Sequence, residues 1–210
     1  MVSKAASETL AEADPPPVAA DGKYLDSNVS GAAKILVVGP LGVGKTTLIG
    51  TVSEIEPLST EASMTQASVR VDPDMDSGKR TTTVALDFGR LTIDGDLVLY
   101  LFGTPGQQRF LPAWQDLAKG ALGALALVDT RDLTASFDAL GNLEDLDLPF
   151  AVAVNVFPSG PRYDADDIRT ALDLLPDTPL VTCDARDRAS SIRALIALVR
   201  HLINVATEPS

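Results

Sequence analysis

The sequence has few of the residues that build metal centres and covalent cross-links. Its 210 residues include one cysteine, one histidine and one tryptophan. A single cysteine, Cys183, cannot form an internal disulfide. One histidine and one cysteine also exclude a zinc cluster and a Cys–His catalytic pair. We therefore expect Cys183 and Trp114 to pack, and His201 to be solvated or packed on a helix. This composition suits a reducing cytoplasm.

Positive charge and long apolar runs are also scarce. Lysine and arginine number 17 against 29 acidic residues, which gives a formal net charge of −12 and argues against a nucleic-acid or anionic-membrane partner. No stretch approaches the roughly 18 apolar residues of a membrane span. The start, Met-Val-Ser-Lys, has neither a signal core nor a myristoylation glycine, and the end has no prenylation cysteine. We expect a cytoplasmic protein whose membrane contact, if any, is made through a partner.

The apolar pattern predicts one folded domain. Residues 1–32 show no apolar periodicity and read as a disordered tail, residues 33–206 as the domain and residues 207–210 as a short tail. The pattern predicts strands at residues 34–39, 84–93, 97–102, 121–128, 150–154 and 179–183. Helices are expected after Thr46, between residues 133 and 143, and over residues 192–203. The segment Pro57 to Arg80 is polar and rich in turn signals.

The order of these elements predicts an α/β fold. Residues 84–93 and 97–102 are joined by Asp94-Gly95, a hairpin signal, and the remaining strands alternate with helices. The expected result is a mostly parallel sheet of about six strands, with one antiparallel hairpin strand and helices on both faces.

The strongest motif is a phosphate-binding loop. Residues 39–46 read Gly-Pro-Leu-Gly-Val-Gly-Lys-Thr, between a predicted strand and a predicted helix. Glycines allow backbone N–H groups to face phosphate oxygens, and the helix N-terminus adds positive field. Lys45 would reach the β- and γ-phosphates, and the Thr46 hydroxyl would bind Mg²⁺. Nucleotide contacts are expected from Gly39, Leu41, Gly42, Val43, Gly44, Lys45, Thr46 and Thr47.

Two later segments resemble the switches of Ras-like GTPases. Thr83 precedes Val-Ala-Leu-Asp-Phe, as the switch I threonine precedes a strand, which implies a second Mg²⁺ ligand; Thr82 and Thr81 remain alternatives. Residues 101–110, Leu-Phe-Gly-Thr-Pro-Gly-Gln-Gln-Arg-Phe, resemble switch II. The resemblance implies that the Gly106 N–H contacts the γ-phosphate and that Gln107 orients the attacking water.

Position 103 departs from the switch II pattern. Gly103 stands where the resemblance places the aspartate that supports the metal. Metal support is then either weaker or supplied by another carboxylate, such as Asp87.

Arg80 has two readings. It stands three residues before Thr83, the offset of the built-in arginine finger in the α subunits of heterotrimeric G proteins. Such a group is worth about 10³ to 10⁵ in rate. The alternative is a solvated arginine beside Lys79 in a polar loop.

The base-reading motif is incomplete. Asn155 matches the first residue of Asn-Lys-x-Asp, but Val156 and Pro158 replace the lysine and the aspartate. Loss of the carboxylate should reduce selectivity for guanine over adenine. Three acids could fold back to replace it or could instead begin the next helix: Asp164, Asp166 and Asp167. A further segment, Asp184, Ala185 and Arg186, resembles the Ser-Ala-Lys loop, with the Ala185 N–H available to the guanine carbonyl.

Together the first three motifs resemble those of the conservon-type GTP-binding proteins of actinobacteria, which are similar to the MglA-like branch of small Ras-like GTPases. The resemblance covers about residues 33–206 and implies a bacterial signalling switch with Mg²⁺ and GTP or GDP. It also implies a roadblock-type regulatory protein and a membrane sensor kinase complex as partners.

Three functions remain open. The first is a regulatory GTPase that hydrolyses GTP slowly, with Gln107, Arg80 and Lys45 as catalytic residues. The second is a pseudo-GTPase scaffold, which Gly103 and Pro158 favour. The third is an ATP-dependent phosphotransferase, for which the short loops offer little material to build an acceptor pocket or a lid.

Overall fold

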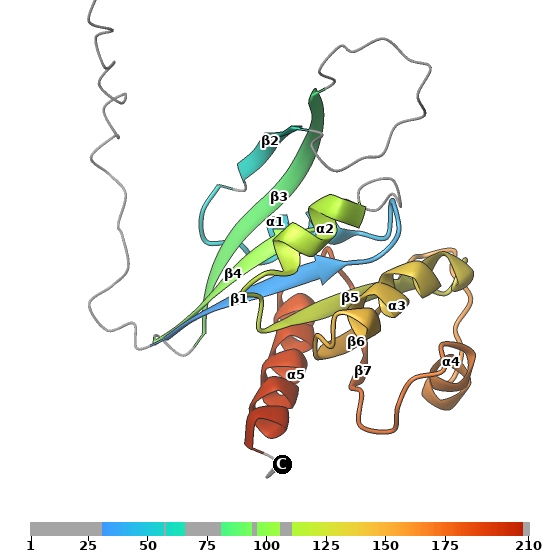
Figure 1. Ribbon diagram of the computed structural model, residues 1–210. Helices are drawn as coiled ribbons and strands as arrows, with labels where there is room; N and C mark the ends of the chain where they lie inside the picture. The colour runs from blue at the N-terminus through green and yellow to red at the C-terminus, as the bar shows by residue number, and fades with distance from the viewer. Residues whose placement is uncertain (1–30, 57, 66–80, 94–95, 106–110, 208–210) are drawn as a thin grey trace, which may run out of the picture.

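The computed structural model describes residues 31–56, 58–65, 81–93, 96–105 and 111–207 (Figure 1). Its strands are β1 (Gly31–Val38), β2 (Leu58–Thr65), β3 (Thr81–Ile93), β4 (Leu97–Gly103), β5 (Gly123–Asp129), β6 (Phe150–Asn155) and β7 (Leu180–Cys183). Its helices are α1 (Lys45–Val52), α2 (Leu111–Ala118), α3 (Phe137–Asp145), α4 (Ala165–Ala171) and α5 (Arg188–Thr207), with a 3₁₀ turn, η2 (Thr134–Ser136), before α3.

The strands form one sheet in the order β2-β3-β4-β1-β5-β6-β7. Figure 1 shows β2 and β3 at one edge and β7 at the other. β3 pairs antiparallel with both β2 and β4, whereas β1, β4, β5, β6 and β7 pair in parallel. Among the described strands, β3 alone therefore runs against the others. Its register places Asp87 opposite Gly103 at the end of β4.

Helices cover both faces of the sheet. One apolar cluster joins the sheet to α1 and α5 and includes Leu48, Ile49 and Leu195; the other joins it to α2, α3 and α4 and includes Trp114 and Leu143. The central strand β5 is buried along its whole length. A strand buried on both faces is apolar at nearly every position, which explains the Gly-Ala-Leu-Ala-Leu-Val run that precedes Asp129. Each fully buried leucine or isoleucine contributes about 1.5–3 kcal/mol.

The structure confirms the predicted fold class. The hairpin strands, the later parallel strands and the closing helix all form where the apolar pattern placed them, within three residues at most ends. Trp114 is 5% exposed on α2, and Cys183 is buried at the end of β7, as expected for packing residues. The disordered tail stays a prediction, because residues 1–30 lie outside the described residues; β1 begins at Gly31.

One strand was not predicted. β2 occupies residues 58–65 inside the segment that the sequence indicates only as polar. It pairs with β3 alone, at the edge of the sheet. An edge strand needs no continuous apolar run, because only one side of it is paired and its faces are less covered. The sequence of β2, Leu-Ser-Thr-Glu-Ala-Ser-Met-Thr, therefore carries almost no strand signal.

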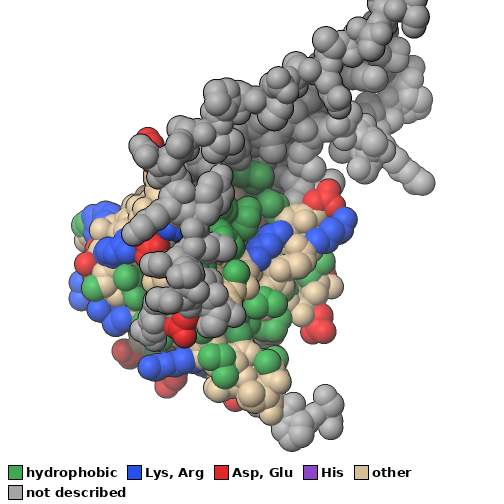
Figure 2. Space-filling view, turned by 90° about the vertical axis from the view of Figure 1, so that its left-hand side faces the viewer, with side chains coloured by type: hydrophobic (Ala, Val, Ile, Leu, Met, Phe, Trp, Pro, Cys, Tyr) green, Lys and Arg blue, Asp and Glu red, His purple; other side chains and the backbone are tan. Residues whose placement is uncertain are grey.

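α5 is long and apolar enough, by length and composition, to cross a membrane. In the structure it packs on β5, β6, β7 and α1, and Ala194, Leu195 and Leu198 are buried in the core. Core helices of globular proteins also reach this length and composition, and 28% of the most apolar window of α5 is buried. On the face shown in Figure 2, basic side chains lie among apolar and acidic ones, so the described part of that face carries no continuous acidic surface.

Candidate nucleotide-binding site

The phosphate-binding loop connects β1 to α1 at the carboxyl edge of the sheet. Gly39 and Gly44 have φ values of 136° and 109°, which residues other than glycine rarely adopt. A Cβ at Gly39 would lie 2.3 Å from Leu127 O, and one at Gly44 would lie 2.6 Å from Asn155 Nδ2. Glycine is therefore required at both positions by conformation and by space. Of the predicted contact residues in this loop, Leu41, Gly42, Thr46 and Thr47 are exposed, whereas Val43 is buried.

Lys45 lies folded over its own loop. Its Nζ donates hydrogen bonds to Gly39 O at 2.8 Å and Pro40 O at 2.7 Å, and the residue is 8% exposed. Burial lowers the pKa of Lys45 to about 8, although the negative charge of Asp87 acts in the opposite direction. An anion placed beside this amine would favour its charged form, so the side chain is suited to contact phosphate.

Thr46, at the start of α1, contacts a carboxylate from β3. Its Oγ1 donates a hydrogen bond of 2.5 Å to Asp87 Oδ2. The two residues are 41 positions apart in sequence, and the register of β3 against β4 brings Asp87 to the phosphate loop. With glycine at position 103, the sequence predicted either weaker metal support or support from another carboxylate, such as Asp87. The structure places Asp87 beside Thr46, the predicted metal ligand.

The two switch segments are only partly described. Thr83 lies in β3, opposite Ser63 of β2, four residues from Asp87 and so roughly 13 Å away along the strand. The Thr104 N–H donates to Val37 O at 3.0 Å, which extends the pairing of β4 with β1. Arg80, Gly106 and Gln107 lie outside the described residues. Their predicted roles, and that of the Thr83 side chain, stay predictions.

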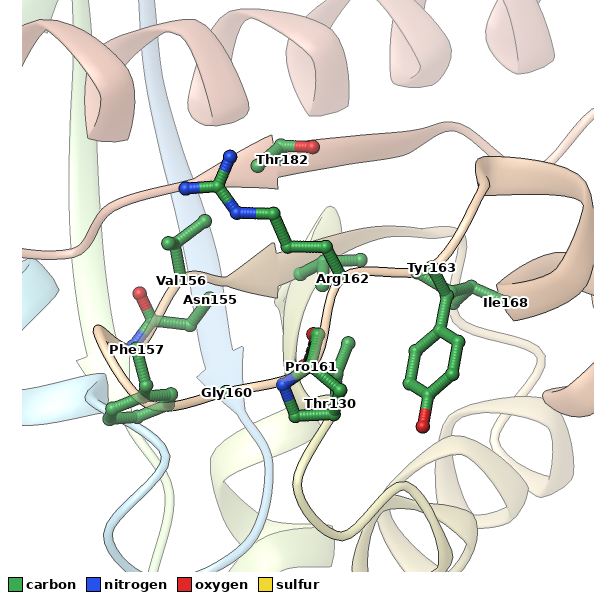
Figure 3. Close-up of a pocket in the computed structure, with 11 residues that line it drawn as sticks. Thr130, Asn155, Val156, Phe157, Gly160, Pro161, Arg162, Tyr163, Ile168 and Thr182 are labelled. Carbon is green, nitrogen blue, oxygen red and sulfur yellow. Dashed lines mark hydrogen bonds between the residues drawn. The ribbon is translucent and has the colours of Figure 1, made fainter.

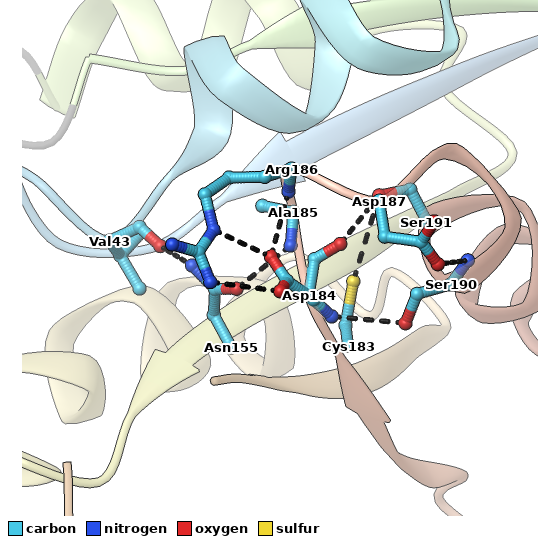
Figure 4. A network of polar contacts seen from close by, with 9 residues as sticks. All are labelled: Val43, Asn155, Cys183, Asp184, Ala185, Arg186, Asp187, Ser190 and Ser191. Carbon is cyan, nitrogen blue, oxygen red and sulfur yellow. Dashed lines mark hydrogen bonds and ion pairs between the residues drawn. The ribbon is translucent and has the colours of Figure 1, made fainter. Parts of the chain in front are cut away.

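Asn155 connects three loops at the carboxyl edge of the sheet (Figure 4). Its Nδ2 donates to Val43 O at 2.7 Å, and its Oδ1 accepts from the Ala185 N–H at 3.0 Å. The residue is 5% exposed. The Ala185 N–H, assigned above to a guanine carbonyl, is therefore occupied by Asn155 in this conformation. Asn155 thus fixes the phosphate loop against the loop that follows β7.

Asp184 and Arg186 form a closed pair beside Ala185. Asp184 Oδ1 accepts from Arg186 Nε at 2.9 Å, and Asp184 Oδ2 accepts from Nη2 at 2.9 Å. These hydrogen bonds lower the pKa of the Asp184 carboxyl below its ordinary value. The neighbouring Cys183 thiol lies 3.9 Å from Ser191 Oγ, and burial raises its pKa, as in an inert thiol.

None of the three acids considered as a replacement for the base-loop aspartate folds back. Asp164 precedes α4 at its N-cap position, and Asp166 and Asp167 form its first turn. There their charges suit the positive end of the helix dipole. The loop after β6 turns instead through Pro158, with the Gly160 N–H donating to Phe157 O at 3.0 Å. Proline favours such a turn because its φ is already fixed.

Sequence reasoning missed a contact between the segment that follows β5 and the base loop. The Arg131 guanidinium lies 3.6 Å from the centroid of the Phe157 ring. Its Nε and Nη2 also donate to the Asp129 carboxylate, at 2.9 Å and 2.6 Å to Oδ2. Burial raises the pKa of Asp129, but these hydrogen bonds and the arginine charge outweigh burial and hold the pKa below its ordinary value. The sequence did contain one signal of this contact, since the apolar strand β5 ends in an acidic residue, Asp129.

A cavity of about 330 Å³ lies beside the base loop (Figure 3). It is lined from the ends of β5, β6 and β7, from the loop at residues 160–163 and from Ile168 of α4. Its described lining includes Arg162 and Tyr163 but no carboxylate. The cavity therefore does not supply the acid that guanine recognition would need.

The oxygen donors of this site suit Mg²⁺. A threonine hydroxyl and one carboxylate, with phosphates to complete the shell, are what Mg²⁺ takes in nucleotide sites. Within the described ranges, no group of three or more His, Cys, Asp or Glu residues could hold a metal by itself. The residues therefore fit a magnesium ion that arrives with a nucleotide better than a metal held by protein alone.

The fold and the loop define a P-loop nucleotide-binding protein with the sheet of a G domain. Two solved structures share this fold. The FeoB G domain from Methanococcus jannaschii is 14% identical in sequence, with a TM-score of 0.56 over 82% of this chain and 99% of that chain. The G domain of the T. maritima FeoB iron transporter is 18% identical, with a TM-score of 0.56 over 84% of this chain and 99% of that chain.

Residues 37–205 match the family described as conserved hypothetical ATP binding protein, and the chain belongs to that family. It is similar to the uncharacterized protein MJ1339 of Methanocaldococcus jannaschii, at 29% identity over 66% of this chain and 75% of that protein. It is also similar to the Ras-related protein RABE1e of Arabidopsis thaliana, at 26% identity over 66% of this chain and 56% of that protein. The protein is thus P-loop GTPase-like.

Proposed function

We propose that the protein is a regulatory GTPase that binds GTP with Mg²⁺, hydrolyses it slowly and signals through the segments around Thr83 and Gln107. The observation that carries the proposal is the convergence at Asn155. One buried amide joins the phosphate loop at Val43 to the loop after β7 at Ala185. The base and the phosphates of one nucleotide would therefore be bound by a single connected unit. Similarity to a Ras-related protein and to G domains supports the same function.

The chain's own residues supply binding and positioning. Lys45 presents its amine at the phosphate loop, and Thr46 begins α1, whose N-terminal N–H groups favour an anion. Mg²⁺, when bound, would neutralise charge on the phosphate oxygens. Gln107 would orient the attacking water, and Arg80 would stabilise charge that develops on the transferred phosphoryl group. Thr83 would contact the metal only after the amino-terminal part of β3 has shifted toward Thr46.

The partners proposed for this switch are a roadblock-type regulatory protein and, through it, a membrane sensor kinase complex. The protein itself would stay cytoplasmic and reach the membrane only through them. These proposals rest on the motifs in the phosphate loop and the two switch segments.

A second candidate is a scaffold with unselective nucleotide binding. The observation favouring it is the exposed Pro158 in the base loop, beside a cavity whose described lining has no acid. Without a carboxylate to accept from the guanine ring, the site loses the paired hydrogen bonds that discriminate most strongly between bases. The family description, which names ATP, makes adenine nucleotides a necessary comparison.

The test is titration of the purified chain with GTP, GDP and ATP in the presence of Mg²⁺, with bound nucleotide extracted and identified. Selective binding of guanine nucleotides and slow release of phosphate support the GTPase. Gln107→Leu should then slow hydrolysis without weakening GTP binding. Equal affinity for ATP and GTP, with no turnover, would favour the scaffold. Transfer of phosphate from ATP to an added small molecule would support a phosphotransferase instead.

A further inference from the structure

The side chain of Asp87 lies close to the space that a side chain at position 103 would enter. Asp87 and Gly103 are directly opposite each other on β3 and β4. A Cβ built at Gly103 would lie 3.0 Å from Asp87 Cβ, 3.2 Å from Asp87 Oδ2 and 3.1 Å from Ile49 Cδ1. These separations are tighter than ordinary van der Waals contact. A side chain at position 103 would therefore require Asp87 and Ile49 to shift by a few tenths of an ångström.

The same carboxylate contacts the predicted metal ligand. Asp87 Oδ2 accepts the hydrogen bond of Thr46 Oγ1, and that is the one described contact between an acidic side chain and the Thr46 hydroxyl. A hydroxyl that donates its hydrogen to a carboxylate keeps its lone pairs for another partner. Thr46 is exposed, so a ligand can reach its hydroxyl.

We infer that Asp87 is the carboxylate of the magnesium site, and that the acid has moved from the end of β4 to the adjacent strand β3. It would hold the Thr46 hydroxyl in place and supply negative charge to Mg²⁺ when the ion is bound with a nucleotide. Gly103 then leaves space for this carboxylate, and its presence does not mean that metal support is lost. The inference rests on the proposed function, since the metal arrives with a nucleotide.

Electrostatics agree with this assignment. The negative charge of Asp87 acts on the neighbouring amine of Lys45, the first residue of α1. One carboxylate, one ammonium and one hydroxyl thus meet at the start of α1. Mg²⁺ sites in nucleotide-binding proteins commonly use one or two carboxylates together with substrate phosphates. The cluster provides that set without an acid on β4.

The experiment measures how Mg²⁺ slows the dissociation of a fluorescent GDP analogue, with a fluorescent ADP analogue in parallel. Dissociation rates are recorded from excess EDTA to millimolar Mg²⁺, and the midpoint of the Mg²⁺ dependence is compared between variants. Asp87→Asn should raise the midpoint about 10- to 100-fold, the usual effect of removing a group that orients a metal ligand. The rate in EDTA should stay near that of the unchanged protein.

Relocation of the acid provides the sharper variant. The double variant Asp87→Gly with Gly103→Asp places a carboxylate on β4 and removes the steric conflict. The midpoint of its Mg²⁺ dependence should therefore lie between those of Asp87→Asn and the unchanged protein. Gly103→Asp alone places two carboxylates against each other and should lower the thermal midpoint in EDTA. Asp177→Asn, at an exposed position distant from Thr46 in the fold, is the charge-matched control and should change neither value.

The outcomes separate the inference from the proposed function. If the unchanged protein retains nucleotide in a Mg²⁺-dependent manner and Asp87→Asn has the same midpoint within twofold, the inference is wrong and the proposed function stands. If the unchanged protein binds neither analogue, or binds with no dependence on Mg²⁺, the inference fails and the GTPase proposal fails with it. Thermal unfolding of every variant in EDTA shows whether a lost effect reflects misfolding.

Discussion

Asn155 and Val43 are 112 residues apart in sequence and are joined by a hydrogen bond of 2.7 Å from the Asn155 side chain to the Val43 carbonyl oxygen. The same side chain accepts the Ala185 N–H. The bond pattern connects the end of β6 to the loops before α1 and α5. The conformation of the phosphate loop therefore depends on a residue of the base loop.

Asn155→Ala should lower the free energy of unfolding by about 1–3 kcal/mol, because it leaves a buried carbonyl and a buried N–H without partners. Nucleotide affinity should fall as well. The measurement is urea unfolding combined with nucleotide titration. Asn204→Ala, at an exposed position of α5, is the matched control and should stay within about 0.5 kcal/mol of the unchanged protein. Equal stability of the two variants would contradict the role given to Asn155.

Two glycine-to-alanine changes should act in opposite directions. At Gly44, a Cβ would approach Asn155 Nδ2 to 2.6 Å at a φ of 109°, so Gly44→Ala should destabilise by about 1–3 kcal/mol. At Gly141, inside α3, a Cβ would meet nothing within 4 Å. Gly141→Ala should therefore stabilise by about 0.5–1 kcal/mol, since alanine loses less entropy in a helix. Urea midpoints measure both effects, and a stabilising Gly44→Ala would contradict the loop geometry.

Lys45 should couple nucleotide binding to proton uptake above pH 8. Burial lowers its pKa to about 8 in the free protein, and phosphate would raise it because a nearby anion favours the charged amine. Binding at pH 9 should then take up close to one proton. Affinity should fall by up to about tenfold per pH unit above pH 8. Isothermal titration calorimetry in buffers of different ionisation enthalpy measures the uptake. Lys45→Arg, whose guanidinium stays charged, should show none at this site.

The stability of the nucleotide-free protein should also depend on pH through Lys45. Its folded-state pKa lies below the ordinary value of 10.5, so the unfolded chain binds more protons between pH 8 and 10.5. The contribution of this group to stability should therefore rise with pH across that window. Thermal midpoints of the unchanged protein and Lys45→Met, compared between pH 7.5 and 9.5, measure it. The same pH trend in both proteins would remove Lys45 as the cause.

Pro158→Asp should increase selectivity for guanine over adenine nucleotides. Asn155 already lies where the base loop begins, and position 158 is exposed in a turn closed by the Gly160 N–H and Phe157 O. A carboxylate there could accept two hydrogen bonds from guanine that adenine cannot donate, which should change the affinity ratio at least about tenfold. Pro158→Asn removes proline without adding the charge and is the control. A ratio that is equal in both variants would show that the turn does not face the base.

Much of the fold follows from local pattern. Residues 34–46 combine a buried strand, a glycine-rich turn and a helix start, and each is specified within a few residues. The run in β5 predicts a central strand because only a strand covered on both faces is apolar throughout. β2 was missed for the opposite reason, since an edge strand of small and polar residues has no apolar period. The phosphate contact of Lys45 and the Mg²⁺ contact of Thr46 are likewise predictions from local sequence, because both follow from the spacing of residues within one loop.

The sequence by itself determined the fold class and the phosphate-loop motif between a strand and a helix. Only the tertiary structure decided which carboxylate meets Thr46, because that depends on β3 pairing with β4 in a register that puts Asp87 opposite Gly103. It also decided that Asp164 lies at the N-cap position of a helix and that Arg131 lies over Phe157. Local patterns follow from backbone geometry and burial along a few residues. Contacts between distant side chains follow from strand order and register, which a single sequence does not show.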